Sequence, residues 1–139
     1  MADTRYIRVL RQAYFVELLG EATYRQGARK IRGGFASRWT EFEGTEIKMQ
    51  RLLHQELQRV IGVWQPSGFA IHVARGVGYL AGILNPSLLG WIIKRVLDQR
   101  RYARWAGQFS SCNPRLWKTL VKHEIRQTDR KDHFEGREA

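Results

Sequence analysis

Clusters of glycine, proline and asparagine divide the chain into five segments, and this division is the strongest constraint on the fold. The breaks lie at residues 33–34, 65–68, 85–87 and 110–114. None of the segments between them shows the sustained alternation of apolar and polar residues that is typical of a half-buried strand. We therefore expect helices over about residues 5–32, 35–64, 69–84, 87–109 and 114–134.

Long helices joined by tight connections predict an all-α fold, an antiparallel helical bundle. At 139 residues with 43% apolar content and five Trp, the chain is long enough for one domain, residues 1–139, with a core over about 5–134. Asn113 followed by Pro114 predicts the N-cap and first residue of the last helix.

Small residues stand at every fourth position of the third segment, where they let another helix approach closely: Ala70, Ala74, Gly78 and Gly82. Residues 76–93 form a mostly apolar stretch that the break at 85–87 interrupts, so a single transmembrane helix is not expected. Two interpretations stay open, a buried helical hairpin and an apolar hairpin that dips into a membrane surface. The basic residues that follow could meet anionic headgroups: Lys94, Arg95, Arg100, Arg101 and Arg104.

The net charge of +11, from 24 Lys and Arg against 13 Asp and Glu, favours an anionic partner. The candidates are an anionic membrane surface, an acidic protein and nucleic acid; a solvated basic surface without a dedicated ligand is the alternative. Nucleic acid is the least favoured, because the Trp residues fit helix stripes as core residues and are poor base-stacking platforms. An oligomer is compatible with the pattern.

The single Cys112 excludes a disulfide framework and a zinc site built on cysteines, and it fits a reducing compartment. The first residues lack the apolar region and cleavage site of a signal peptide. We expect a cytoplasmic protein, with peripheral attachment to the inner membrane as the further option. No glycine-rich phosphate loop, nucleophile elbow or Cys–His pair is present in the sequence.

Several acidic residues fall on the apolar stripes of the expected helices. Glu17 and Glu21 lie near the centre of the first stripe, which is formed by Tyr6, Leu10, Tyr14, Tyr24 and Ala28. Glu46 lies within the second stripe, with Glu43 at its edge. His123, Glu124 and Gln127 fall on the last stripe, with Leu116, Trp117, Leu120 and Phe134. In the fourth segment the expected stripe includes Gln99, Ala103 and Ala106.

Buried carboxylates are costly unless they pair with a cation, accept hydrogen bonds or bind a metal ion. One interpretation pairs each acid with an Arg or a Tyr hydroxyl. The other is a carboxylate site for iron or manganese, as helical bundles build from inward glutamates. Its candidate ligands are Glu17, Glu21, Glu46, His123 and Glu124.

These residues resemble the ferritin-like superfamily. Gly20-Glu21-Ala22 and His123-Glu124 are similar to motifs on the first and last helices of short bacterial ferritin-like proteins. The spacing of Glu17 and Tyr24, and the apolar hairpin that leads to Tyr102, resemble the membrane-peripheral ubiquinone-ring hydroxylases. The second resemblance implies membrane association and hydroxylation of a quinone ring by two irons.

The sequence departs from the hydroxylase pattern at the metal ligands. Glu43 is followed by Glu46, and Glu46 by Met49, where a histidine is expected. Glu124 is likewise followed by Gln127. We therefore expect a ferritin-like bundle with a degenerate carboxylate site, acting as a basic interaction module at an anionic membrane surface or in a larger complex. The alternatives are an iron- or manganese-dependent oxidoreductase, less favoured, and a nucleic-acid-binding protein.

Overall fold

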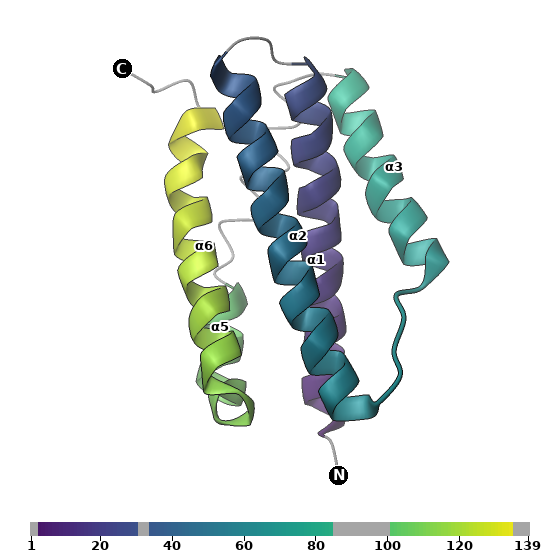
Figure 1. Ribbon diagram of the computed structural model, residues 1–139, viewed down its shortest axis with the longest axis vertical. Coiled ribbons are helices and arrows are strands. Elements are labelled where there is room, and N and C mark those ends of the chain that lie inside the picture. The colour runs from purple at the N-terminus through teal and green to yellow at the C-terminus, as the bar shows by residue number, and fades with distance from the viewer. Residues whose placement is uncertain (1–2, 31–33, 85–100, 135–139) are drawn as a thin grey trace. The chain divides into compact units, whose positions relative to one another are not determined.

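The computed structural model describes residues 3–30, 34–84 and 101–134, and every element of this described part is helical (Figure 1). The all-α prediction is thereby confirmed. The elements are α1 (Thr4–Lys30), α2 (Gly34–Ile61), α3 (Gly68–Leu84), α5 (Arg101–Phe109), a 3-10 turn η1 (Ser110–Cys112) and α6 (Pro114–Phe134). They belong to two compact units, Met1–Leu89 and Gly90–Ala139. The predicted break at 85–87, the first part of the fourth helix, and Lys94, Arg95 and Arg100 lie outside the described residues.

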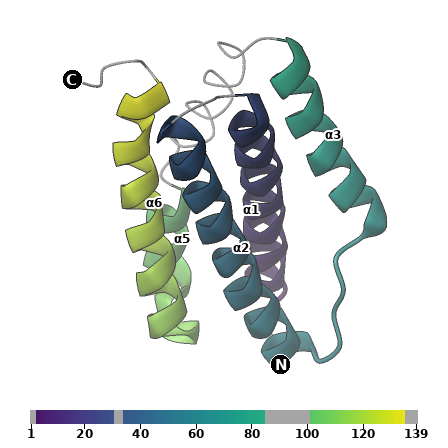
Figure 2. The ribbon, with the colours of Figure 1, turned by 45° about the horizontal axis from the view of Figure 1, so that its top comes forward.

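The first helix pair, α1 and α2, runs side by side in opposite directions (Figures 1 and 2). The hydroxyl of Tyr6 donates to Glu56 near one end, and Arg25 donates to Glu43 near the other. Four apolar residues of these two helices have no solvent exposure: Leu10, Ala13, Leu53 and Leu57. Whether the whole chain forms one antiparallel ferritin-like bundle stays a prediction.

Helix α2 ends at Ile61, three residues before the predicted end. Gly62 has a φ of 85°, and its N–H donates to the carbonyl of Gln58 over 2.8 Å. This left-handed conformation suits glycine and closes the last helical turn. The chain then turns back, so that the Trp64 ring meets Tyr14 edge-on at 5.0 Å and the Trp64 carbonyl lies 2.9 Å from His54 Nε2.

Helix α3 packs against α1. Ala74 is fully buried, which fits the predicted small-residue surface for close helix approach. Gly78 and Gly82 lie in α3 as well, but their burial is outside what the structure describes. Of the helices described here, none is long and apolar enough to span a bilayer.

In the second unit, α5 and η1 pack against α6. The predicted cap of α6 is confirmed, because the N–H of Leu116 donates to Asn113 Oδ1 over 3.2 Å. The predicted phase of the fourth helix is wrong in α5. Ala103 is exposed, whereas Tyr102 and Phe109 are buried. The larger aromatic side chains bury more apolar surface than the alanines, so they determine which face is covered.

Candidate functional site

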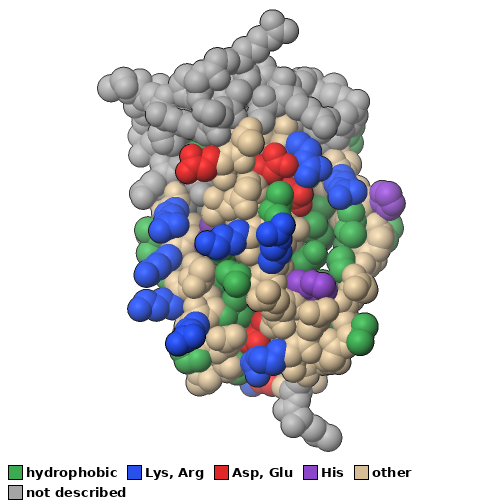
Figure 3. All heavy atoms as spheres, viewed as in Figure 1, with side chains coloured by type: hydrophobic (Ala, Val, Ile, Leu, Met, Phe, Trp, Pro, Cys, Tyr) green, Lys and Arg blue, Asp and Glu red, His purple; other side chains and the backbone are tan. Residues whose placement is uncertain are grey.

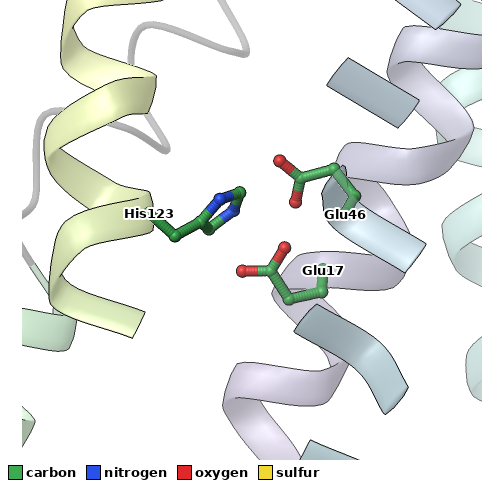
Figure 4. A group of neighbouring side chains, drawn as sticks. All are labelled: Glu17, Glu46 and His123. Carbon is green, nitrogen blue, oxygen red and sulfur yellow. The ribbon is translucent and has the colours of Figure 1, made fainter. Parts of the chain in front are cut away.

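Glu17 and Glu46 are buried, as their positions on the apolar stripes predict. Glu17 is 0% exposed and Glu46 is 1% exposed. Their nearest carboxylate oxygens lie within 4.8 Å of each other, although the residues belong to different helices. Both carboxylate groups project from α1 and α2 in the same direction (Figure 4). Such a pair of buried acids is stabilised by a proton, a cationic side chain or a metal ion.

Gly20 makes room for the Glu46 side chain on the surface of α1. A Cβ atom at position 20 would lie 2.8 Å from Glu46 Oε2 and 3.0 Å from its Cδ. The carboxylate of Glu46 therefore rests directly on the backbone of α1, one turn from Glu17. A side chain at this position would displace the carboxylate, because the end of a glutamate is the part that can move. The "GEA" motif thus supplies Glu21 and also a glycine, Gly20, that leaves space for the Glu46 carboxylate.

Glu21 takes part in a polar network between α1 and α2. Its Oε1 accepts from Arg25 Nη2 and its Oε2 accepts from Gln50 Nε2, over 2.8 and 2.7 Å. Arg25 Nε also donates to Glu43 Oε1 over 2.8 Å, and Gln50 Nε2 donates to the carbonyl of Glu17 over 3.3 Å. For Glu21 and Glu43 this is the pairing with arginine that the sequence offered as an alternative to metal binding.

The polar network also shifts the pKa of Arg25 and that of Tyr14. The hydrogen bond to Glu43 raises the pKa of Arg25, and the charge of Glu21 adds to this effect against the opposing effect of burial. Burial raises the pKa of Tyr14, and the negative charge of Glu21 raises it further. Arg25 is thus held as a cation and Tyr14 as a neutral phenol. Tyr14 therefore adds no negative charge to this part of the interface.

Glu56 is a buried acid that the sequence-based reasoning missed. It is 2% exposed, accepts from the hydroxyl of Tyr6 and forms an ion pair with Arg59. Its position between the stripe residues Leu53 and Leu57, with an arginine three residues later, was the available signal. The contacts explain its burial without a metal ion.

The other two predicted site residues lie on α6, in the second unit. Glu124 accepts from the backbone N–H of Tyr102 over 2.8 Å and from that of Ala103 over 3.3 Å. It therefore caps the first turn of α5, where a negative charge is favourable. His123 is 2% exposed. That these two residues share a metal site with the glutamates of the first unit stays a prediction.

Inward acids leave the outer surface with an excess of positive charge. Among the acidic residues whose exposure is described, Asp3 and Glu41 alone are exposed. Lys and Arg side chains are spread widely over the face seen in Figure 3. In the described part the exposed cations are Arg5, Arg8, Arg11, Lys48, Arg51, Arg59, Arg75, Arg104, Arg115, Lys118, Lys122 and Arg126.

Four of these cations form a stripe on α6, which we call the α6 cationic stripe: Arg115, Lys118, Lys122 and Arg126. At 100° per residue they fall within about 80° of one another around the helix axis. All four are exposed. Arg104 on α5 is exposed as well, and Arg101 is half-buried; these are the two members of the predicted anionic-partner surface that the structure describes.

No family model, curated protein or solved structure matches the chain. The resemblance to the ferritin-like superfamily therefore stays a prediction.

The network around Arg25 can be tested by a double-mutant cycle with Arg25→Met and Glu43→Gln. We expect Arg25→Met to lower the free energy of unfolding by about 1 kcal/mol, because the 36% exposed side chain is partly screened by solvent. The same substitution should cost less in the Glu43→Gln background, with a coupling of about 0.5 kcal/mol or more. Denaturant unfolding of the four proteins gives these values.

Arg51→Met is the matched control, since Arg51 is an exposed arginine of α2. It should change the free energy of unfolding by less than about 0.5 kcal/mol. Equal losses for the two arginine variants, or strict additivity in the cycle, would contradict the network.

Proposed function

We propose that this protein is a helical interaction module that binds an acidic partner surface through its cationic exterior. The observation that carries the proposal is the α6 cationic stripe, four exposed basic residues on one face of a helix. Most of the acidic side chains whose exposure is described are buried or half-buried, so they do little to offset the positive charge of this stripe. A field of one sign attracts anionic partners and accelerates their encounter.

The charge-reversal variant Lys118→Glu/Lys122→Glu tests this function. Wild-type protein should bind an acidic probe, either polyglutamate or vesicles that contain phosphatidylserine, at about 0.15 M salt and lose most of this binding at about 1 M, where screening is nearly complete. The variant should bind at least about tenfold more weakly, because two cations are replaced by two anions. Co-sedimentation and fluorescence anisotropy measure the two interactions.

Lys48→Glu/Arg51→Glu, an equal charge reversal on α2, separates the stripe from net charge. Its loss should be clearly smaller than that of the α6 variant. If wild-type protein binds neither acidic probe at low salt, or if both reversals weaken binding equally, the proposed role of the stripe is wrong.

A second candidate function is the binding of a divalent metal ion by Glu17 and Glu46. The observation in its favour is the pair of buried carboxylates within 4.8 Å, one of them seated on Gly20. Carboxylate oxygens suit hard cations such as Mn²⁺. Two oxygens at about 2.1 Å from one ion lie at most about 4.2 Å apart, which a small side-chain rotation would reach. The ion would supply positive charge at the pair, and the two residues would hold it.

Titration of chelator-treated protein with Mn²⁺, followed by the paramagnetic resonance of free Mn²⁺, tests the second candidate. We expect saturable binding of one ion per chain, lost in Glu46→Gln and weakened by about 10–100-fold in Gly20→Ala, which displaces the Glu46 carboxylate. Gly20→Ala should not lower stability, because alanine favours the helix by up to about 1 kcal/mol. His123→Gln, measured in the same titration, tests the sequence-based prediction that His123 of the second unit is also a metal ligand.

Glu41→Gln, which removes an exposed carboxylate from the same helix, is the control. Binding that this variant weakens as much as Glu46→Gln, or an absence of saturable binding, would exclude the metal site.

A further inference from the structure

We infer that α3 is a membrane-docking helix, whose outer face inserts into the surface of an anionic bilayer. This inference rests on the proposed function, because it names a lipid surface as the acidic partner. Its distinct content is that apolar contact through α3, in addition to charge, holds the protein there.

The outer face of α3 carries four exposed apolar side chains, which we call the α3 apolar stripe: Phe69, Val73, Val77 and Leu80. Their exposed fractions are 79, 37, 39 and 56%. At 100° per residue they lie within about 80° of one another around the helix axis. Six large hydrophobic residues are exposed in the described part, and four of them belong to this stripe. Such a concentration marks an interaction surface.

Packing against α1 leaves this stripe uncovered. Helix α3 is in contact with α1, where Ala74 is fully buried. The stripe residues lie on a different side of the helix, and Val63, in the segment that leads into α3, is 92% exposed as well. The helix thus has one face that packs on its own unit and one apolar face toward the outside.

The charges around α3 favour an anionic bilayer as the occupant of the stripe. No Asp or Glu stands between Glu56 and Asp98 in the sequence. Arg75, on the polar face of α3, is exposed, and Arg59 offsets the charge of Glu56, with which it forms an ion pair. A helix with an apolar face that carries an aromatic residue and with a cation on its polar face is typical of segments that lie in the bilayer interface.

A second copy of this chain is a poorer occupant of the stripe. Each copy carries a net charge of +11, so two copies repel each other, whereas an anionic bilayer attracts each copy. The described helices are also too short or too polar to cross a bilayer, which agrees with contact at its surface. The lipid surface therefore explains the apolar face and the cations together.

Vesicle partitioning tests this inference with phosphatidylcholine alone and with phosphatidylcholine mixed with phosphatidylserine. Wild-type protein should partition into the mixed vesicles and much less into the neutral ones. Phe69→Gln and Leu80→Gln should each lower the partition coefficient about tenfold, because glutamine keeps the helix but removes the buried apolar surface.

Ile125→Gln is the matched control, since Ile125 is 59% exposed on α6 and Leu80 is 56% exposed. Its partition coefficient should stay within about twofold of the wild-type value. Unchanged partitioning of Phe69→Gln and Leu80→Gln, or an equal loss in Ile125→Gln, would overturn the docking role of α3. Circular dichroism confirms that each variant keeps its helices.

The outcomes also separate this inference from the proposed function. Binding to polyglutamate without binding to mixed vesicles would overturn the inference and leave the acidic-partner function standing, whereas binding to neither would overturn both. A dimer in sedimentation equilibrium that Phe69→Gln abolishes would assign the stripe to a second copy and overturn the inference.

Discussion

Carboxylates that point into the interface between α1 and α2 determine both the register of this helix pair and the charge of its surface. Tyr6 meets Glu56 near one end, and Arg25 bridges Glu21 and Glu43 near the other. Sliding one helix by a turn would separate both pairs and leave buried acids without these contacts, which is costly. The polar contacts therefore specify one alignment, while the buried leucines of the two helices add apolar burial.

The same inward acids explain why the exterior is so basic. Glu17, Glu46 and Glu56 are buried, so their side chains are not part of the outer surface. Among the residues whose exposure is described, the exposed arginines and lysines of α1, α2 and α6 then outnumber the two exposed acids, Asp3 and Glu41. A polar interface and a basic exterior are thus two consequences of one arrangement, and α3 adds an exposed apolar surface to it.

Much of the fold could be predicted from the sequence, because its signals are local. The Asn113-Pro114 pair specified the start of α6, and the 3.6-residue period placed Glu17 and Glu46 inside. The predicted end of α2 is too late, because the left-handed turn at Gly62 ends the helix before the stronger break at residues 65–68. In α5 periodicity predicts Ala103 and Ala106 on the inner face, although Tyr102 and Phe109 offer more surface to bury.

The partners of the inward acids could be predicted only as classes. Pairing with arginine or tyrosine was one of two interpretations, and the structure assigns Arg25 to Glu21 and Glu43, and Tyr6 to Glu56. The roles of Gly20 and Gln50 depend on which residues of the other helix lie opposite them, which periodicity within one helix does not specify. For the same reason the cap that Glu124 gives to α5 could not be predicted from the sequence.

The exposure of the apolar face of α3 could likewise not be predicted from the sequence, because an apolar helix is as typical of a protein core as of a surface that contacts lipid. Spin labelling of Val77→Cys in a Cys112→Ser background tests most directly which face meets the partner. On vesicles that contain phosphatidylserine, the label at position 77 should become accessible to lipid-soluble oxygen and lose access to a water-soluble nickel chelate, while a label at Lys48→Cys should stay in water. A label at position 77 that keeps its full access to the nickel chelate on such vesicles would contradict the account.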